Sequence, residues 1–324
     1  MSRKISVIMV TYNSSHVVVD SLAPIAGHDD MEIVVLDNAS TDDTCSVVST
    51  RFPEMTLLRG DTNMGFARGV NTAVRSARGD VLVLLNPDAV ISADGIRKLA
   101  DRVLDTGAVV APVVQHPQGL LAVGSSGRFP TTWRMFTHYS GLSRIRRVPA
   151  FAGHYTLLSQ MPSRTVLDVD WVSGGCLAVA RPQWNQLSGL SERWFMYAED
   201  VDFCWRVSNT GGRCVVDTGV AATHLVGGSD GTPSRTPNSQ WILNLYDFAA
   251  LRILSGRASS VRWGVVVAAG LALRAQIFRV QALLDRAHRE PRVRAAAAFD
   301  AHARAVLRRA LTIARGKDEK GAQT

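Results

Sequence analysis

The stretch Asp80-Val81-Leu82-Val83-Leu84-Leu85-Asn86-Pro87-Asp88-Ala89 sets five consecutive aliphatic residues directly before a polar turn. Such a run is typical of a strand that is buried on both faces of a parallel sheet. The same pattern, an apolar run that stops on polar residues, recurs at residues 5–15, 32–43 and 55–71, at intervals of about 25 residues. This alternation of strand, polar loop and helix predicts an α/β fold with an open, mostly parallel central sheet flanked by helices.

Each apolar run ends on acids or amides. Thr11-Tyr12-Asn13 follows the first run, Asp37-Asn38 follows the second, and Asn86-Pro87-Asp88 follows the run quoted above. In open parallel sheets, ligands bind beyond the carboxyl ends of the strands, so we expect these side chains to share one cleft. The chain has no G-x-G-x-x-G and no P-loop motif, which argues against dinucleotide and P-loop chemistry. Carboxylates can face a diphosphate when a divalent cation stands between them.

Composition is that of a globular protein, because 46% of the 324 residues are hydrophobic and 20% are charged. That length is enough for one large α/β domain with an appendage. The four cysteines (Cys45, Cys176, Cys204 and Cys214) show no C-x-x-C spacing, so neither a zinc site nor a disulfide framework is indicated. The N-terminus runs into a strand-like segment with no signal-peptide core, which favours a cytoplasmic protein.

Net charge is +8, but it is unevenly distributed. Residues 252–315 contain 13 arginines and three acids, a net charge of +10, so the rest of the chain is close to −2. The basic character therefore belongs to the C-terminal segment.

A second informative stretch, residues 194–206, places Glu199, Asp200 and Asp202 among large apolar side chains. Burying an ionised carboxylate without a partner costs several kcal/mol, so acids among aromatics indicate a site. The same acids would also suit the solvated first turn of a helix, and the stretch alone leaves both interpretations open. In a helix, Glu199 and Asp202 lie on nearly the same face and Asp200 points elsewhere. We expect Asp202 to pair with Arg206.

Five motifs in order resemble the inverting family 2 glycosyltransferases of the GT-A fold. They are Thr11-Tyr12-Asn13, the acidic loop at residues 37–42, Asn63-x-Gly65-Phe66-x-x-Gly69-x-Asn71, Asn86-Pro87-Asp88 and Glu199-Asp200. The resemblance covers roughly residues 4–230. The third and fourth motifs together are typical of the rhamnosyltransferase subgroup.

The resemblance implies a substrate class and a cofactor. The expected reaction moves L-rhamnose from dTDP-rhamnose to N-acetylglucosamine on a polyprenyl diphosphate, in cell-wall linker synthesis, with Mg²⁺ or Mn²⁺ as cofactor. Two alternatives stay open. The donor could be another nucleotide sugar, such as a UDP-hexose or UDP-galactofuranose. The chain could also be a non-catalytic nucleotide-sugar-binding module.

The resemblance also implies roles for individual residues. The donor-binding residues are Thr11, Tyr12, Asn13, Asp37, Asn38, Asn63, Gly65, Phe66, Arg68 and Asn86. The metal ligands are Asp88 and His224, the acceptor-binding residues are Glu199, Trp171, Gly174 and Gly175, and the catalytic base is Asp200.

Several of these roles have plain structural alternatives. Asp37 would accept a hydrogen bond from the base of the nucleotide, but it could be a capping acid. Trp171 could be a core tryptophan, and His224 could be structural. The family's common metal motif is Asp-x-Asp, and its first position here is Asn86, which leaves Asp88 as a single firm carboxylate ligand.

Inverting transfer needs one base that takes the proton of the acceptor hydroxyl as it attacks the sugar. By the resemblance this base is Asp200. We therefore expect the carboxyl groups of Asp88 and Asp200 to converge on one cleft.

We expect three parts along the chain. Residues 1–235 form the catalytic domain, with a nucleotide-sugar half at 1–113 and an acceptor half at 114–235. Residues 236–316 form a basic helical extension, and residues 317–324 a disordered tail.

Within the extension, residues 263–273 are an apolar run of 11, shorter than the about 20 residues that cross a bilayer. Such a helix suits peripheral contact with the inner face of the plasma membrane through its arginines. The alternatives are packing on the catalytic domain or across a homodimer. Nucleic acid is not an expected partner, since no base-reading motif accompanies the charge.

Overall fold

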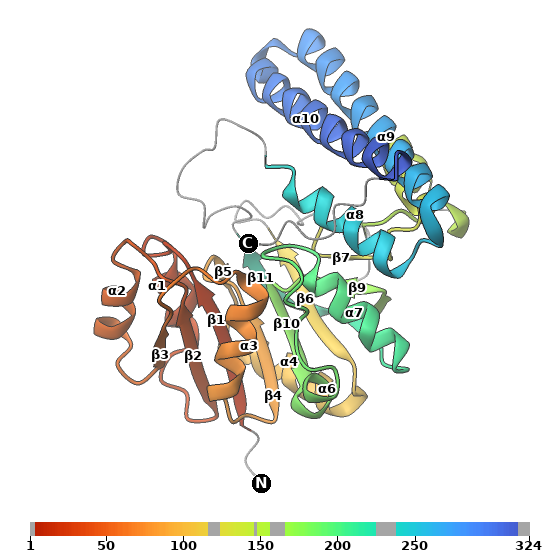
Figure 1. The fold of residues 1–324 in the computed structure, drawn as a ribbon. Coiled ribbons are helices and arrows are strands. Elements are labelled where there is room, and N and C mark those ends of the chain that lie inside the picture. The colour runs from red at the N-terminus through yellow and green to blue at the C-terminus, as the bar shows by residue number, and fades with distance from the viewer. Residues whose placement is uncertain (1–3, 116–123, 146–147, 156–165, 225–237, 317–324) are drawn as a thin grey trace. The chain divides into compact units, whose positions relative to one another are not determined.

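A computed structural model describes residues 4–115, 124–145, 148–155, 166–224 and 238–316, and the expected tail at 317–324 lies outside them. The chain divides into two compact units. The sheet unit comprises Met1–Gly127 and Tyr155–Pro233, and the helical unit comprises Arg128–His154 and Ser234–Thr324 (Figure 1). Residues 128–154, which were expected in the acceptor half, group with the C-terminal helices in the structure.

The first half of the sheet unit is parallel, as predicted. Its strands are β1 (Ile5–Thr11), β2 (Met31–Asp37), β3 (Thr56–Arg59) and β4 (Val81–Leu85), in the spatial order β3-β2-β1-β4. The connecting helices are α1 (Val18–Leu22), η1 (Ala23–Ile25), α2 (Thr44–Arg51), α3 (Phe66–Ser76) and α4 (Ala93–Thr106). All residues of β1 and β4 are buried, which is why these strands read as continuous apolar runs.

The second half of the sheet is mixed rather than parallel. Its elements are β5 (Ala89–Val90), β6 (Val109–Gln115), β8 (Val166–Val169), β10 (Cys176–Ala180) and β11 (Cys214–His224), with helices α6 (Arg181–Gln186) and α7 (Glu199–Asn209). A separate ribbon pairs β7 (Ser126–Gly127) with β9 (Trp171–Val172). β10 lies antiparallel between β4 and β6, whereas β11 is parallel to β6 and antiparallel to β5 and β8.

The direction of β10 positions the site. Because β10 is antiparallel to β4, its first residue, Cys176, pairs with Leu85 at the carboxyl end of β4. Gly174 and Gly175, which precede β10, therefore reach the same edge of the sheet as the residues that follow β4. β11 extends through a bulge to His224, which is the last residue of the strand rather than part of a following loop.

Helices cover the sheet with buried apolar stripes at helical spacing. In α4 these are Ile96, Leu99, Ala100 and Val103, and the helix begins at Ser92, whose hydroxyl accepts from the Gly95 amide. Burial of these residues against the central strands forms the core of the sheet unit.

The helical unit contains α5 (Thr132–Ser140), η2 (Leu142–Arg144), η3 (Pro149–Phe151), α8 (Gln240–Arg252), α9 (Gly256–Leu284), η5 (Arg286–His288) and α10 (Arg289–Ala314). Specific contacts tie residues 128–154 to its helices. Trp263 is fully buried and donates from Nε1 to the Pro130 carbonyl at 2.7 Å. Gly270 lets α9 approach α5, since a Cβ there would lie 2.3 Å from Cβ of Tyr139.

α9 is longer than the apolar run that the sequence highlights. It has 29 residues, and an 18-residue window has a mean hydropathy of 1.4, so length and composition alone would allow it to cross a membrane. About a third of that window (33%) is buried within the protein, which is also what a partly buried helix of a bundle shows.

We expect Trp263→Ala to destabilise the helical unit by about 3–5 kcal/mol, because it leaves a cavity and an unpaired Pro130 carbonyl. Thermal unfolding of the full chain measures this. Leu284→Ala is the control, since Leu284 is 81% exposed, and its effect should stay within about 0.5 kcal/mol. Equal effects of the two substitutions would contradict the assignment of Trp263 to the core.

Candidate active site

Asp37 lies at the carboxyl end of β2 and is 2% exposed. Its Oδ1 accepts from the hydroxyls of Thr11 (3.0 Å) and Ser40 (2.5 Å), and its Oδ2 accepts from the Ser40 amide (2.9 Å). The carboxylate thus holds together the loops after β1 and β2. This is the capping arrangement that the sequence left open, and binding of a nucleotide base by Asp37 stays a prediction.

Amide side chains hold the neighbouring loops at the same edge. Asn38 donates from Nδ2 to Asn63 Oδ1 (2.8 Å) and to the Gly65 carbonyl (3.2 Å), and its Oδ1 accepts from the Met64 amide. Asn13 Oδ1 accepts from the Thr41 amide at 2.8 Å. These contacts bring the predicted donor residues into one cluster around the ends of β1 and β2.

Two other predicted donor residues are more exposed. Tyr12 is 43% exposed beside this cluster. Arg68, on α3, donates from Nε to Glu192 Oε2 at 3.1 Å, and its side chain is 60% exposed. Its guanidinium is therefore engaged with a carboxylate that sequence analysis did not identify.

Asp88 and His224 face each other across the β5–β11 pairing, in which His224 pairs with Ala89. His224 Nε2 lies 2.9 Å from Asp88 Oδ1, and the side chains are 16% and 3% exposed. Asn86 donates from its backbone amide to the Gly175 carbonyl at 2.9 Å. The predicted metal residues and Asn86 therefore lie together beside Gly175.

Asp200 lies in the first turn of α7 and is half-buried. Its Oδ2 accepts from the Gly174 amide (2.9 Å), and its Oδ1 accepts from the Val201 amide (2.8 Å). Burial raises the pKa of the Asp200 carboxyl above its ordinary value, and these backbone hydrogen bonds counteract part of that rise. A carboxylate with a raised pKa is a stronger base than a solvated aspartate.

The adjacent glycines Gly174 and Gly175 connect the two acids. A Cβ on Gly174 would lie 3.6 Å from Cβ of Asp200, and a Cβ on Gly175 would lie 3.1 Å from Cε1 of His224. Since His224 bonds Asp88, a short chain of contacts runs from Asp200 to Asp88. The two carboxylates thus converge on the same edge of the sheet, as the sequence predicted.

The three acids of α7 have different surroundings. Asp202 is fully buried and pairs with Arg206 at 2.8 Å, which confirms the predicted i,i+4 contact. Glu199, on nearly the same face, is also buried, and its Oε2 has no hydrogen-bond partner among the described residues. Burial, followed by the nearby charge of Asp200, raises the pKa of Glu199 well above its ordinary value. Burial therefore raises the pKa of Glu199 more strongly than that of Asp200, whose carboxylate accepts backbone hydrogen bonds.

The predicted acceptor residue Trp171 is only 4% exposed and packs edge to face on Tyr155, with ring centroids 5.9 Å apart. Burial and then the charge of Asp200 raise the pKa of Tyr155 to about 12. Sequence analysis missed Tyr155, which lies in a stretch without motif or periodicity.

Phe66 and Gly65 begin α3 beside this region. Phe66 donates its backbone amide to the Phe195 carbonyl at 2.8 Å. Gly65 has φ +84°, and a Cβ there would lie 2.4 Å from the same carbonyl oxygen, so only glycine fits. Tyr197 and Ala198, directly before α7, both have left-handed φ values of 70° and 78°. Consecutive strained residues of this kind are characteristic of functional sites.

Asp88 and His224 supply an oxygen and a nitrogen donor, which fit a divalent cation that takes its other ligands from phosphate oxygens and water. No group of three or more His, Cys, Asp or Glu residues within the described ranges could enclose a metal without such help. This donor set therefore fits a metal that binds together with a nucleotide diphosphate.

The mixed sheet and the helices that flank it form the GT-A fold. Residues 6–167, half of the chain, match the sequence model of the family described as glycosyl transferase family 2. The chain belongs to this family, and it is a glycosyltransferase.

Two characterised relatives are similar to this chain. The N-acetylglucosaminyl-diphospho-decaprenol L-rhamnosyltransferase of Mycobacterium tuberculosis is 27% identical over 305 residues, which cover 89% of this chain and 97% of that protein. The low-salt glycan biosynthesis hexosyltransferase Agl10 of Haloferax volcanii is 25% identical over 207 residues, which cover 62% of this chain and 61% of that protein.

Solved structures share the fold at low sequence identity. The mannosyltransferase PcManGT of Pyrobaculum calidifontis, in complex with GDP-Man and Mn²⁺, has a TM-score of 0.50 at 18% identity and covers 100% of this chain and 77% of that chain. GalNAc-T7 with UDP, GalNAc and Mn²⁺ has a TM-score of 0.53 at 13% identity and covers 77% of this chain and 50% of that chain. These likenesses establish the GT-A fold.

We expect Glu199→Gln to raise the melting temperature by an amount that grows with pH. The pKa of Glu199 in the folded state is above the unfolded value of 4.5, so wild-type stability falls as pH rises from 4.5 through that raised pKa. Glutamine does not ionise, so the variant does not lose this stability at high pH. Its melting temperature should exceed that of wild type by on the order of 5 °C at pH 8 and by little at pH 4.

Melting curves between pH 4 and pH 9 measure this difference. Glu54→Gln is the control, because Glu54 is exposed. A difference for Glu199→Gln that is constant over the whole range would contradict the assignment of a buried, protonated Glu199.

Proposed function

We propose that the protein is an inverting, metal-dependent glycosyltransferase that moves L-rhamnose from dTDP-rhamnose to N-acetylglucosamine carried on a polyprenyl diphosphate, in cell-wall linker synthesis. One observation carries the proposal. The Gly174 amide donates a hydrogen bond to the Asp200 carboxylate. The next residue, Gly175, lies against the ring of His224, which is hydrogen-bonded to Asp88. A base and a cation-binding pair thus flank one short stretch of backbone.

In the proposed reaction, Asp200 accepts the proton of the acceptor hydroxyl. The oxygen of that hydroxyl forms a bond to the anomeric carbon, while the bond from that carbon to the diphosphate oxygen breaks on the opposite face. The Gly174 amide orients the Asp200 carboxylate during the proton transfer. Asp88 and His224 would hold Mg²⁺ or Mn²⁺, which stabilises the negative charge of the departing nucleoside diphosphate.

The remaining site residues are assigned by the family resemblance. Thr11, Tyr12, Asn13, Asp37, Asn38, Asn63, Gly65, Phe66, Arg68 and Asn86 bind the donor. Glu199, Trp171, Gly174 and Gly175 line the acceptor side. A protonated Glu199 can donate a hydrogen bond, which suits a sugar oxygen.

The choice of rhamnose and of a lipid-linked acceptor rests on the mycobacterial relative, whose name gives both. The hexosyltransferase relative supports the alternative, a donor such as a UDP-hexose or UDP-galactofuranose. A thermal-shift screen of dTDP- and UDP-sugars with Mg²⁺ or Mn²⁺ distinguishes these donors, because the true donor stabilises the folded protein most at equal concentration.

We expect Asp200→Asn to bind the nucleotide sugar as wild type does and to lose at least about 100-fold in turnover, because asparagine cannot accept the proton. Donor affinity is measured by calorimetry and turnover by transfer to a synthetic polyprenyl-diphosphate acceptor. Asp168→Asn is the matched control, since Asp168 is an exposed acid that pairs with Arg213. Turnover near that of wild type in Asp200→Asn would refute the assignment of the base.

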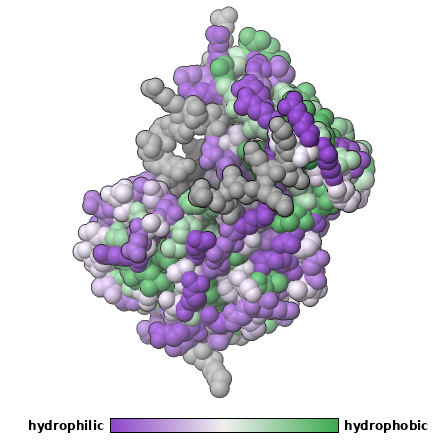
Figure 2. All heavy atoms as spheres, viewed as in Figure 1, coloured by the Kyte–Doolittle hydropathy of each residue, from purple (hydrophilic) through white to green (hydrophobic). Residues whose placement is uncertain are grey.

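We also propose that the helical unit contacts the membrane that carries the acceptor. Leu273, Ile277, Val280 and Leu284 are 42–81% exposed and follow one another at helical spacing on a single face of α9. Exposed arginines lie on the same helix pair, at Arg262, Arg289, Arg304 and Arg308. Figure 2 shows apolar and polar residues side by side over these helices. An apolar stripe with arginines suits an anionic lipid interface.

We expect the double substitution Ile277→Gln and Leu284→Gln to weaken binding to vesicles that contain phosphatidylglycerol by about tenfold, because two apolar side chains no longer enter the interface. Vesicle co-sedimentation at low and high salt measures this. Leu104→Gln is the control, since Leu104 on α4 is as exposed (42%) as Ile277. Unchanged vesicle binding would favour packing of this face against protein.

A further inference from the structure

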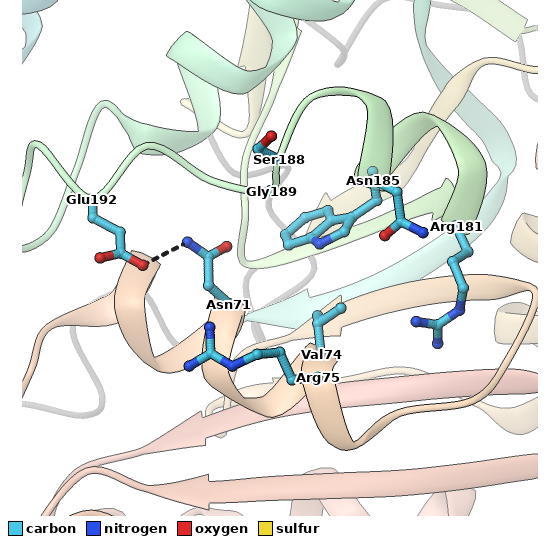
Figure 3. Close-up of a pocket in the computed structure, with 9 residues that line it drawn as sticks. Asn71, Val74, Arg75, Arg181, Asn185, Ser188, Gly189 and Glu192 are labelled. Atoms are coloured by element: carbon cyan, nitrogen blue, oxygen red, sulfur yellow. Dashed lines mark hydrogen bonds between the residues drawn. The ribbon is translucent and has the colours of Figure 1, made fainter.

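Asn71 is the last residue of the Asn-x-Gly-Phe-x-x-Gly-x-Asn motif and lies on α3. Its side chain bonds both backbone groups of Leu190. The Leu190 amide donates to Oδ1 at 2.9 Å, and Nδ2 donates to the Leu190 carbonyl at 2.9 Å. Nδ2 also donates to Glu192 Oε1 at 3.1 Å (Figure 3). One amide thereby holds two residues of the segment 188–198, here called the base loop because it ends two residues before Asp200.

Two more contacts join α3 to the base loop. Glu192 Oε2 accepts from Arg68 Nε at 3.1 Å, and the Phe195 carbonyl accepts from the Phe66 amide at 2.8 Å. Positions 66, 68 and 71 of α3 therefore hold the base loop at positions 195, 192 and 190 in turn. This row of contacts is here called the α3 clamp.

α7 holds the start of the base loop from the other side. Arg206 donates to the carbonyls of Leu187 (2.6 Å) and Gly189 (2.8 Å). Its guanidinium is oriented by the fully buried carboxylate of Asp202. The segment is therefore fixed to α3 and to α7 by charged or amide side chains.

An open hollow of about 370 Å³ lies beside Asn71 (Figure 3), although Leu190, the loop residue that Asn71 bonds, is itself buried at 2% exposure. It is lined by residues from α3, α6 and the loop, namely Val74, Arg75, Trp184, Asn185, Ser188 and Gly189. The side chains of Leu190 and Trp194 pack the loop into the core, and the hydrogen bonds to Asn71 fix its position on the side that faces the hollow.

The backbone of the base loop is strained at both ends. Ser188 and Gly189 have φ of 56° and 72°, and Tyr197 and Ala198 have φ of 70° and 78°. Left-handed conformations cost non-glycine residues conformational free energy, so they persist only where surrounding contacts impose them. At Gly189 a Cβ would also lie 2.4 Å from Oδ1 of Asn71, which couples this glycine to the clamp.

We propose that Asn71 and Glu192 are positioning residues for Asp200, which they place by clamping the strained base loop to α3. The inference rests on the proposed role of Asp200 as the base. Ala198, the last loop residue, precedes the first turn of α7, and its carbonyl accepts from the Asp202 amide. Displacement of the loop therefore moves that turn and the contact between Asp200 and Gly174.

The test compares wild type with Asn71→Ala, Glu192→Ala and Glu192→Gln. Asn71→Ala and Glu192→Ala lower kcat by about tenfold because the base is displaced. The KM for donor stays within about twofold in Asn71→Ala, which is the deciding variant, since Glu192→Ala also releases Arg68, a proposed donor residue. Glu192→Gln keeps an acceptor for Asn71 and retains most of the wild-type kcat. Asp94→Ala, which removes an exposed ion pair with Lys98 on α4, leaves kcat unchanged.

The pH profile separates positioning from loss of folded protein. Water that reaches a displaced Asp200 lowers the pKa of its carboxyl toward the ordinary value, so the acid limb of kcat moves to lower pH in Asn71→Ala. A structural role alone would scale the whole profile without moving it. An unchanged kcat, an unmoved acid limb, or an equal loss of kcat and donor affinity overturns the proposal.

Hydrogen exchange tests the clamp without activity. The Leu190 amide, which is bonded to Asn71, exchanges faster in Asn71→Ala than in wild type or Asp94→Ala, and equal exchange overturns the clamp. If wild type transfers no sugar, the proposed function fails, and this measurement still decides whether Asn71 holds the base loop.

Discussion

The hydrogen bond from the Gly174 amide to Asp200 is the contact on which the site depends. It joins α7, which carries Asp200, to the turn before β10, and the next residue of that turn meets Asn86 and His224. Side chains at positions 174 and 175 would separate these groups, because each Cβ would lie 3.1–3.2 Å from a neighbouring ring. Two residues without side chains thus let Asp200 of α7 and the Asp88–His224 pair meet the same short stretch of backbone.

The neighbouring acids Glu199 and Asp200 differ in how readily they ionise. Glu199 and Asp200 adjoin in sequence, yet Asp200 accepts hydrogen bonds from the amides of Gly174 and Val201, whereas Glu199 is buried and its Oε2 has no partner among the described residues. Ionising two adjacent buried carboxyl groups costs more free energy than ionising one. The carboxyl group with the better hydrogen bonds therefore ionises first. This division leaves one acid that can accept a proton and one that can donate a hydrogen bond, within a single helical turn.

Much of this arrangement could be predicted from sequence, because strands that end on acids and amides reveal the ligand edge. The open α/β sheet and the edge that holds Asp88 were predicted in this way, whereas the place of Asp200 beside that edge was expected from the family resemblance. The direction of β10 could not be predicted, since a buried strand has the same apolar pattern whether it is parallel or antiparallel to its neighbours. The contact of Asn71 could not be predicted, because its partner is the backbone of Leu190. Every residue type has the same backbone groups, so the sequence does not identify such a partner.

The grouping of residues 128–154 with the C-terminal helices has a consequence for biosynthesis. The hydrogen bond between Trp263 and Pro130 spans 133 residues, so residues 128–154 leave the ribosome long before the helix that covers them. Until α8 and α9 are made, Phe129 lacks its ring contact with Phe248, and Tyr139 lacks its contact with Gly270. Non-local pairing of this kind is slow. The nascent chain therefore exposes an apolar segment until the C-terminal helices are synthesised. During that time we expect chaperones to bind it.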